Sequence, residues 1–304
     1  MSIKTGRAEG KAQVTINYDK CSHCGFCADI CCGTCDGPLY VKDGQVVIDQ
    51  SRLFGCIGCG HCMAICPHNC ICVEGRTISH NDAVDFPHAH KPTYTELYTL
   101  LFLRRSIRRF KDKEVEQELI DKIIDAVTTA PVGLPPSDVE ILIFKGHKKV
   151  QLFAHDLVEA IYKRRFLFSP MMRPLLRPFV GKEFMEICRT YMYPTMNFLK
   201  KAKDKGHDWL FYNAPVLMYF HVSPYGDAVD PLISAAYAML TAESLGLGGS
   251  LIGTPTHFLK HNNTLKKKYK IPLKNQQGIA FIMGYPKYEF KKGIKRTISY
   301  VRYY

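Results

Sequence analysis

The sequence lacks the features that mark several large classes of protein. No low-complexity tract interrupts its 304 residues, and a content of 46% hydrophobic and 23% charged residues is typical of a globular chain. Residues 1–11 are polar and do not contain the apolar core of a secretory signal. Of the two most apolar stretches, residues 213–222 are too short to span a membrane, and residues 231–253 carry Glu243 and a glycine cluster. These absences predict a soluble, cytoplasmic protein that does not contact a membrane.

Acidic residues are scarce relative to basic ones. The chain has 28 Asp and Glu against 41 Lys and Arg, which gives a formal net charge of +13. A basic chain can bind nucleic acid, but the sequence has no RNP pattern, zinc finger or recognition helix. Basic runs such as Lys266–Lys268 and Lys291–Lys292 are typical of solvated faces. We therefore expect no nucleic-acid partner.

Cysteine is abundant by contrast, and eight of the thirteen cysteines form two copies of the spacing C-x-x-C-x-x-C-x-x-x-C, offset by 35 positions. A cubane iron-sulfur cluster takes four thiolates, and in two-cluster proteins each run lends its fourth cysteine to the other cluster. The spacing predicts a first cluster bound by Cys21, Cys24, Cys27 and Cys66, and a second bound by Cys56, Cys59, Cys62 and Cys31.

Zinc and disulfides are the alternatives for these cysteines. Zinc sites usually combine paired C-x-x-C or Cys/His spacings, and an intracellular chain keeps its thiols reduced. The two three-cysteine runs therefore disfavour zinc, and the reducing interior of a cell disfavours disulfides. The remaining N-terminal cysteines fit no ligand position, so a buried or spare thiol is expected at Cys32, Cys35, Cys70 and Cys72. The linker histidines have no i, i+4 pairing, so solvated rings are expected at His80, His88 and His90.

Residues 14–78 resemble a bacterial-type ferredoxin with two 4Fe-4S clusters. The second run ends Cys66-Pro67 as in that family, whereas Cys31 is followed by Cys32 in place of proline. The resemblance implies a ferredoxin domain over residues 1–85 and a linker at about 79–93. It also implies oxygen-sensitive clusters, which suit an anaerobic cell.

The rest of the chain alternates helical and strand patterns. Apolar residues recur at helical spacing over 94–105 and 113–129, the second with Asp112 as its N-cap, and over 231–245. Nearly continuous apolar runs predict buried strands over 139–144, 214–220 and 278–284. Residues 149–207 are expected to be helical with breaks at Pro170, Pro174, Pro178 and Pro194, and the basic tail 287–304 is expected to be extended.

A second cofactor site is predicted where two of these helices meet. Arg104, Arg105, Ser106 and Arg108 place guanidinium and hydroxyl groups within one turn, which suits either a phosphate ligand or a charged helix end. The glycines of residues 246–251 follow a helix, and Leu251 stands where a third glycine belongs, so a dinucleotide-binding loop is excluded.

The motif R-R-S-x-R-x-F, together with Ala130-Pro131, Ala214-Pro215 and Gly-Leu-Gly before a strand, resembles the FMN-dependent nitroreductase family over residues 94–302. The resemblance implies an α+β domain over 86–304 with a central, mainly antiparallel sheet flanked by helices, and a homodimer with FMN at its interface. The FMN contacts that it implies are Arg104, Arg105, Ser106, Arg108, Pro131, Val132, Gly133, Leu251, Ile252, Gly253, Lys295 and Arg296. The family's polar stretch after the second helix is replaced here by Val132–Ser137, so backbone contacts are expected there.

Together the two resemblances predict an oxidoreductase. Clusters exchange single electrons, whereas a flavin can hold two, so we expect electrons to pass through the clusters to FMN and on to a nitroaromatic, nitroheterocyclic or quinone-type acceptor. The electron source would be NAD(P)H or an external low-potential donor. No catalytic side chain is needed beyond the cofactors, and the acceptor is expected near Phe166, Phe168, Tyr191 or Tyr193. The alternatives are flavin fragmentation, reductive dehalogenation, or a non-catalytic electron carrier or redox sensor.

Overall fold

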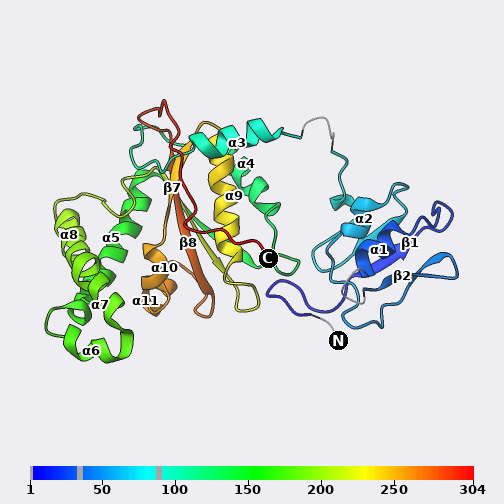
Figure 1. The fold of residues 1–304 in the computed structure, drawn as a ribbon, viewed down its shortest axis with the longest axis horizontal. Coiled ribbons are helices and arrows are strands. Elements are labelled where there is room, and N and C mark those ends of the chain that lie inside the picture. Colours follow the sequence, from blue (N-terminus) through cyan, green and yellow to red (C-terminus); the bar gives the residue numbers. More distant parts are fainter. Residues whose placement is uncertain (1–2, 33–36, 87–90) are drawn as a thin grey trace. The chain divides into compact units, whose positions relative to one another are not determined.

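The computed structural model describes residues 3–32, 37–86 and 91–304, which form two compact units (Figure 1). The N-terminal unit combines residues 1–91 with the segments 131–139 and 222–230, and the C-terminal unit contains residues 92–130, 140–221 and 231–304. Cys35, His88, His90 and the side chain of Cys32 lie outside the described residues.

Two short antiparallel strand pairs and two helices make up most of the N-terminal unit. Strand β1 (Gln13–Ile16) pairs with β4 (Ile71–Glu74), and β2 (Leu39–Lys42) pairs with β3 (Gln45–Ile48). Helices α1 (Phe26–Cys32) and α2 (His61–Ile65) each begin inside one of the cysteine runs, and a 3-10 turn follows at His80–Asp82. The two predicted strands are confirmed, but neither helix was predicted because each is too short to show helical periodicity.

The core of the N-terminal unit is built from the strands and from the cysteines themselves. Val14, Leu39, Val46 and Val73 are almost fully buried, and they pack in one cluster with the thiol side chains between α1 and α2. Thiols therefore occupy the place that aliphatic side chains fill in an ordinary small domain, and this arrangement leaves little apolar area to stabilise the unit.

The segments 131–139 and 222–230 join this unit through a buried carboxylate. Asp138 is 5% exposed, and its Oδ2 atom accepts hydrogen bonds of 2.6 Å from the Gly6 amide and from the Ser223 hydroxyl. The Arg7 guanidinium also donates to the Ser137 carbonyl oxygen. These long-range bonds attach two segments of the expected second domain to residues near the N-terminus. The N-terminal unit therefore contains segments that lie after residue 85 in the sequence.

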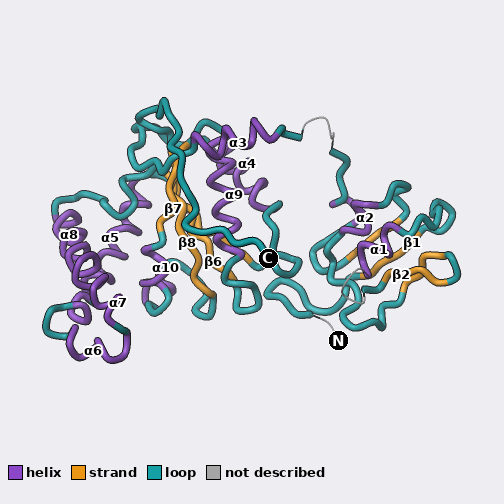
Figure 2. Tube along the Cα trace, in the orientation of Figure 1, coloured by secondary structure: helices purple, strands orange, loops and turns teal. Residues whose placement is uncertain are grey.

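A four-stranded sheet organises the C-terminal unit. It consists of β5 (Val139–Lys145), β6 (Val216–Val222), β7 (Gly248–Ile252) and β8 (Gln276–Gly284) in the order β5-β6-β8-β7, with β7 and β8 antiparallel. Every residue of β6 is buried, as expected for an inner strand. Figure 2 shows helices on both sides of this sheet. The predicted strands are confirmed, although β6 begins at Val216 and not at Ala214.

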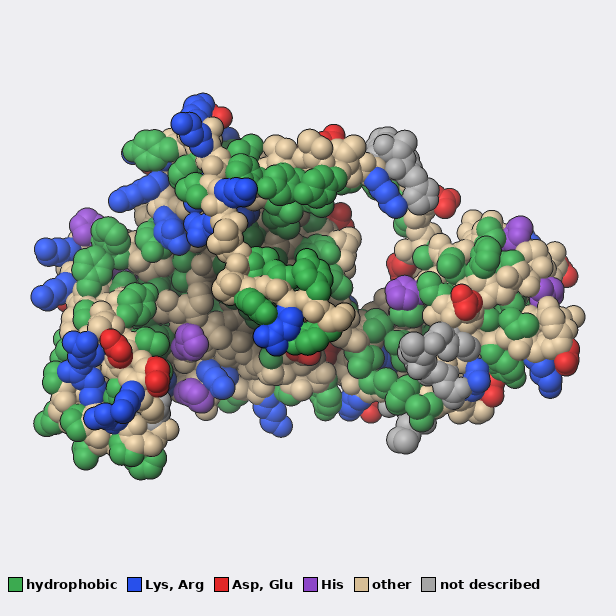
Figure 3. Space-filling model, viewed as in Figure 1, with side chains coloured by type: hydrophobic (Ala, Val, Ile, Leu, Met, Phe, Trp, Pro, Cys, Tyr) green, Lys and Arg blue, Asp and Glu red, His purple; other side chains and the backbone are tan. Residues whose placement is uncertain are grey.

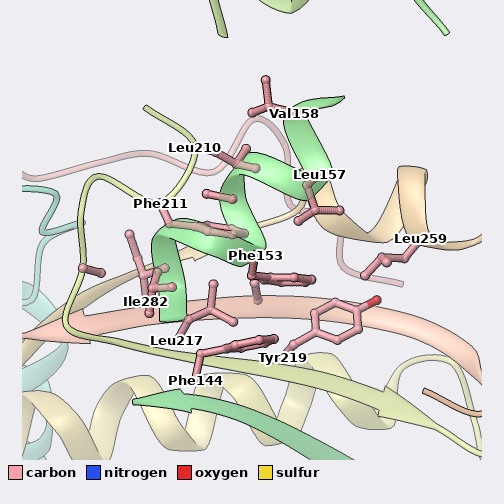
Figure 4. Close-up of a cluster of buried hydrophobic side chains, with 14 of the residues drawn as sticks. Phe144, Phe153, Leu157, Val158, Leu210, Phe211, Leu217, Tyr219, Leu259 and Ile282 are labelled. Carbon is pink, nitrogen blue, oxygen red and sulfur yellow. The ribbon is translucent and has the colours of Figure 1, made fainter. Parts of the chain in front are cut away.

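Aromatic residues dominate the core on one face of this sheet. Helix α5 (His147–Lys163) lays Phe153 and Leu157 over the strands, where the Phe153 ring stacks on Phe144 at a centroid distance of 4.4 Å (Figure 4). Phe211 stacks on the opposite side of Phe153 at 5.7 Å. Helix α9 (Asp230–Ser244) is the buried helix predicted over 231–245.

The other α-helices of this unit are α3 (Tyr94–Leu103), α4 (Gln117–Thr128), α6 (Arg173–Val180), α7 (Lys182–Ile187), α8 (Tyr193–Asp204), α10 (Thr254–Leu259) and α11 (Asn263–Lys268). A 3-10 helix covers Arg165–Phe168, and a π-helix covers Cys188–Met192. Asp112 was predicted as the N-cap of α4, but Glu116 occupies that position, because Asp112 lies in a turn in which the Lys113 amide donates to the Lys111 carbonyl oxygen. Pro178 lies inside α6 and does not break it. Among the described residues, none of the helices has the length and apolar character needed to cross a membrane.

Candidate redox-cofactor sites

The first thiol site is formed by Cys21, Cys24, Cys27 and Cys66, which line one cavity of the N-terminal unit. Cys21 and Cys24 come from the loop that leads into α1, Cys27 lies in the first turn of α1, and Cys66 directly follows α2. The backbone holds two of these residues by local bonds, since the His23 amide donates to Cys21 Sγ and the Cys66 amide donates to the Met63 carbonyl oxygen. The structure thus brings together the four cysteines that the spacing assigns to one cluster.

The second thiol site is formed by Cys31, Cys56, Cys59 and Cys62, which line a cavity of about 440 Å³. Cys31 comes from α1, and the other three come from the second run. Apolar side chains surround these thiols, and residues 132–135 of the segment 131–139 complete the wall. This is again the predicted crossed set, with one ligand from the first run and three from the second. That the two sets hold iron stays a prediction.

Burial makes three of these thiols, Cys27, Cys56 and Cys62, poor anions unless a cation is present. It raises the pKa of Cys62 to about 12, helped by the neighbouring thiols of Cys56, Cys31 and Cys59. Burial also raises the pKa of Cys56 and of Cys27. A coordinated metal deprotonates a thiol outright, and several converging buried sulfurs are the donor set that iron-sulfur clusters use. The residues present therefore fit such clusters.

Arg76 is a buried cation beside the second thiol site that the sequence did not single out. Arg76 is 8% exposed. Its guanidinium donates hydrogen bonds to four backbone carbonyl oxygens, those of Ile57 (2.9 Å), Ile3 (2.6 Å), Gly10 (2.8 Å) and Pro135 (2.9 Å). Its charge acts on Cys56, where it partly opposes the effect of burial on the pKa of that thiol. No spacing rule marks this residue, because all its partners are backbone carbonyl groups.

A third group of metal-ligand types lies on the surface of the N-terminal unit. Ligand atoms of Cys72, Glu74 and His80 all lie within 4.8 Å of one another. His80 Nδ1 lies 2.8 Å from Glu74 Oε1, and the His80 amide also donates to that oxygen at 3.0 Å. The Glu74 carboxylate is thus already bonded to the amide and the ring of His80, the first residue of the 3-10 turn. We therefore interpret Cys72, Glu74 and His80 as an exposed side-chain pair with a neighbouring thiol.

The arginine motif of the C-terminal unit, residues 104–108, directly follows α3. Arg104 caps the C-terminus of α3, and Ser106 forms a parallel bridge with Gly249 at the start of β7. The Arg108 guanidinium carbon lies 5.6 Å from the centre of the Tyr212 ring. Within residues 91–304, none of these arginines forms an ion pair with a carboxylate, so their charge remains available for an anionic ligand.

Arg105 also lines a cavity of about 440 Å³ together with Lys111 and Lys287. Glu243 and Glu289 line the same cavity; the pKa of Glu243 is raised by burial, an effect that Arg104 opposes. Three cations thus face two carboxylates, and the excess of basic groups suits a phosphate.

The remaining predicted FMN contacts fall into three groups. Leu251 and Ile252 form the end of β7 and Gly253 follows it, and the start of β7 is joined to the arginine motif through the bridge between Ser106 and Gly249. Lys295 and Arg296 are exposed on the tail. Pro131, Val132 and Gly133 belong to the N-terminal unit, where the Gly133 amide lies 3.3 Å from Asp230 Oδ1. The structure thus joins β7 to the arginine motif through Ser106 and places Val132 and Gly133 beside the second thiol site.

The aromatic residues expected near an acceptor lie in the helical region that follows α5. Phe166 is 50% exposed and Tyr191 is 65% exposed, whereas Phe168 and Tyr193 are partly buried. Among the described residues, no ring stacking or cation–π contact joins any of them to the arginine motif, so their role stays a prediction.

Comparison with known proteins identifies the C-terminal part of the chain. A model of the nitroreductase family matches residues 102–285. Similar solved structures include an FMN-bound nitroreductase from Bacteroides fragilis (16% identity, 68% of this chain and 99% of that chain, TM-score 0.47) and one from Desulfitobacterium hafniense (19%, 67% and 97%, 0.45). Another is oxidised iodotyrosine deiodinase bound to FMN and 3-iodo-L-tyrosine (19%, 68% and 98%, 0.46). A search of curated proteins gives no match.

Proposed function

We propose that this chain, which belongs to the nitroreductase family, is an FMN-dependent oxidoreductase that draws its electrons through two 4Fe-4S clusters of its own. The final acceptor would be a small electron-poor molecule, either a nitroaromatic or nitroheterocyclic compound or a quinone. The clusters supply single electrons at low potential, and FMN collects two of them for the acceptor. The upstream source would be an external low-potential donor or NAD(P)H.

One observation carries this proposal. Val132 and Gly133, two of the residues expected to contact FMN, line the same cavity as Cys31, Cys56, Cys59 and Cys62. A cluster held by these four thiols would thus lie against the loop 131–135. The second thiol site is therefore the one from which electrons leave for the flavin, and the first thiol site is the one nearer the external donor.

The two sets of cysteines serve to hold and insulate the clusters. Buried sulfurs such as Cys27, Cys56 and Cys62 keep water away from the iron, whereas Cys24 and Cys59 are exposed. Exposed ligands give electrons a short path from the surface. Arg76 places a positive charge beside the second thiol site, and such a charge favours the reduced, more negative form of a cluster.

The flavin would be held by the basic residues of the C-terminal unit. Arg104, Arg105 and Arg108 supply charge for its phosphate, Ser106 supplies a hydroxyl, and Lys295 and Arg296 add charge from the tail. Backbone groups at Leu251, Ile252 and Gly253 would face the ring. A guanidinium that has no carboxylate partner loses no ion pair when it binds a phosphate.

A homodimer is part of this proposal, and the surface of α3 supports it. Its residues Leu97, Tyr98 and Leu101 are each 46–48% exposed, and no residue of this helix is buried. Figure 3 shows hydrophobic side chains gathered over this helix. A mostly apolar helix without a buried residue is typical of an interface between subunits, and α3 leads directly into the arginine motif.

The relay is tested by anaerobic reconstitution with iron and sulfide, addition of FMN, and rapid mixing with a reduced low-potential ferredoxin as donor. We expect fast reduction of the flavin in the parent protein and much slower reduction in Cys59→Ala, because that substitution removes a ligand of the second thiol site. Cys72→Ala is the control, because it removes a thiol outside both sites. In this variant we expect the flavin to be reduced at the parental rate.

Equal rates in Cys59→Ala and the parent protein would exclude the relay. Turnover of a haloaromatic compound or of flavin itself, with nitro compounds and quinones inert, would indicate dehalogenation or flavin fragmentation instead. Tight binding of a partner protein without turnover of any acceptor would indicate an electron carrier or redox sensor.

A further inference from the structure

The first thiol site contains a fifth sulfur. Cys70 lines the same cavity as Cys21, Cys24, Cys27 and Cys66, and its Sγ atom lies 3.4 Å from Cys66 Sγ. The Cys70 thiol also interacts with Cys21. One cubane cluster takes four thiolates from the protein, so this site has one sulfur more than the cluster can use at a time.

Backbone structure fixes Cys70 in this position. A turn follows α2, in which the Asn69 amide donates to the Cys66 carbonyl oxygen and Asn69 adopts a φ of 47°. The Cys70 carbonyl oxygen accepts a 2.8 Å hydrogen bond from the Asn17 amide at the end of the β1–β4 pair. Cys66 and Cys70 are therefore held side by side by elements on both sides of the turn, and Cys70 is only 6% exposed.

We propose that Cys70 is a reserve ligand, able to bind the iron atom that Cys66 binds. This inference rests on the proposed function, because it assumes that the first thiol site holds a cluster. In the exchange, a bond forms between Cys70 Sγ and iron and the bond between Cys66 Sγ and iron breaks. The Cys70 thiol releases its proton and the Cys66 thiolate takes one up, so the charge of the site and the oxidation state of the iron are unchanged.

The reserve ligand would protect the more exposed of the two positions. Cys66 is partly buried, whereas Cys70 is buried, so an oxidant reaches Cys66 first. Loss of Cys66 as a ligand would then leave the cluster bound through Cys70. The second thiol site differs, because the cysteines described around its cavity are only the four predicted ligands Cys31, Cys56, Cys59 and Cys62.

The test compares four variants of the full chain by iron content and by electron paramagnetic resonance of the oxidised protein after anaerobic reconstitution. Cys66→Ala is expected to keep about eight iron atoms, four per cluster, and to give no signal from a three-iron cluster. Cys66→Ala/Cys70→Ala is expected to lose the first cluster or to convert it to a three-iron form. Cys70→Ala alone should match the parent protein, which also shows that the turn tolerates alanine there.

Cys24→Ala is the matched control, because Cys24 is a predicted ligand of the same cluster on the exposed loop. It should lose iron even though Cys70 is present. A three-iron signal or loss of about four iron atoms in Cys66→Ala would overturn the inference, and so would an intact cluster in the double variant. Absence of iron from the parent protein would instead contradict the proposed function.

Discussion

The Arg76 guanidinium donates a 2.9 Å hydrogen bond to the carbonyl oxygen of Pro135. The same side chain holds the carbonyl oxygen of Ile57, the residue after Cys56, so one cation connects the second thiol site to the loop 131–135. All of these bonds are made by one planar group with five N–H donors, and lysine cannot reproduce this geometry.

Arg76→Lys should therefore destabilise the N-terminal unit and slow electron transfer to the flavin. Each buried carbonyl group left without a donor costs roughly 1–3 kcal/mol, so we expect a clearly lower urea midpoint as well as slower flavin reduction. Arg7→Lys is the control, because Arg7 also donates to this segment, at the Ser137 carbonyl oxygen, but from an exposed position. An Arg76→Lys protein as stable as the Arg7→Lys protein would contradict the role given to Arg76.

Arg108→Ala should weaken the binding of FMN. A hydrogen bond to a charged group contributes roughly 1.5–3 kcal/mol, which corresponds to an increase in Kd of roughly 10- to 150-fold. Arg109→Ala removes the adjacent exposed arginine, which is outside the predicted contacts, and should leave the Kd within about twofold. Fluorescence titration of apoprotein with FMN measures both values, and an unchanged Kd in Arg108→Ala would remove Arg108 from the site.

Leu97→Glu combined with Leu101→Glu should shift the protein from dimer to monomer. Both side chains are 46% exposed on α3, and two carboxylates would be buried without partners at the expected interface. Sedimentation velocity measures the mass. Leu152→Glu on α5 places a charge at another exposed leucine, 62% exposed, and should leave the dimer intact. A parent protein that sediments as a monomer would refute this assignment.

Stability should fall as the pH drops below about 6.5, in part because of His221. Burial lowers the pKa of this histidine on β6, Lys266 on α11 acts in the same direction, and Glu140 on β5 opposes them. Asn275 lies 3.0 Å from its Nδ1 atom. Below the unfolded pKa the unfolded chain binds a proton that the folded chain does not, so the free energy of unfolding decreases.

His221→Gln removes this titrating group and should flatten the pH dependence of the urea midpoint between pH 7 and about pH 5. Its stability at neutral pH is expected to be lower because a buried ring is lost, so the slope with pH is the relevant measurement. The same slope in the parent and variant proteins would show that other groups cause the acid sensitivity.

Much of this organisation could be predicted from the sequence, for specific physical reasons. Ligation requires a fixed spacing of cysteines, so the crossed sets around Cys31 and Cys66 were recognisable before any fold was known. Long apolar periodicity likewise located α9 and β8. The start of α4 was missed because Asp112 is a good N-cap residue by type. Tertiary and turn contacts hold it outside the helix, since the Lys111 amide donates to the Tyr285 carbonyl oxygen and the Lys113 amide donates to the Lys111 carbonyl oxygen.

Other features depend on contacts across the chain that no local pattern encodes. The position of Arg76 follows from carbonyl groups at residues 3, 10, 57 and 135, and the contact between Cys66 and Cys70 follows from the turn at Asn69. The attachment of segment 131–139 to the N-terminal unit follows from the buried Asp138 carboxylate. Each of these is a tertiary arrangement whose residues are ordinary in sequence.

The central claim is that one chain carries two iron-sulfur clusters and a flavin. Quantification of iron, zinc, acid-labile sulfide and FMN in anaerobically purified protein tests it most directly, together with the visible spectrum. We predict about eight iron atoms and about eight sulfides per chain, four of each per cluster, with one FMN and no stoichiometric zinc. Zinc in place of iron, or protein that binds no flavin after incubation with FMN, would contradict the claim.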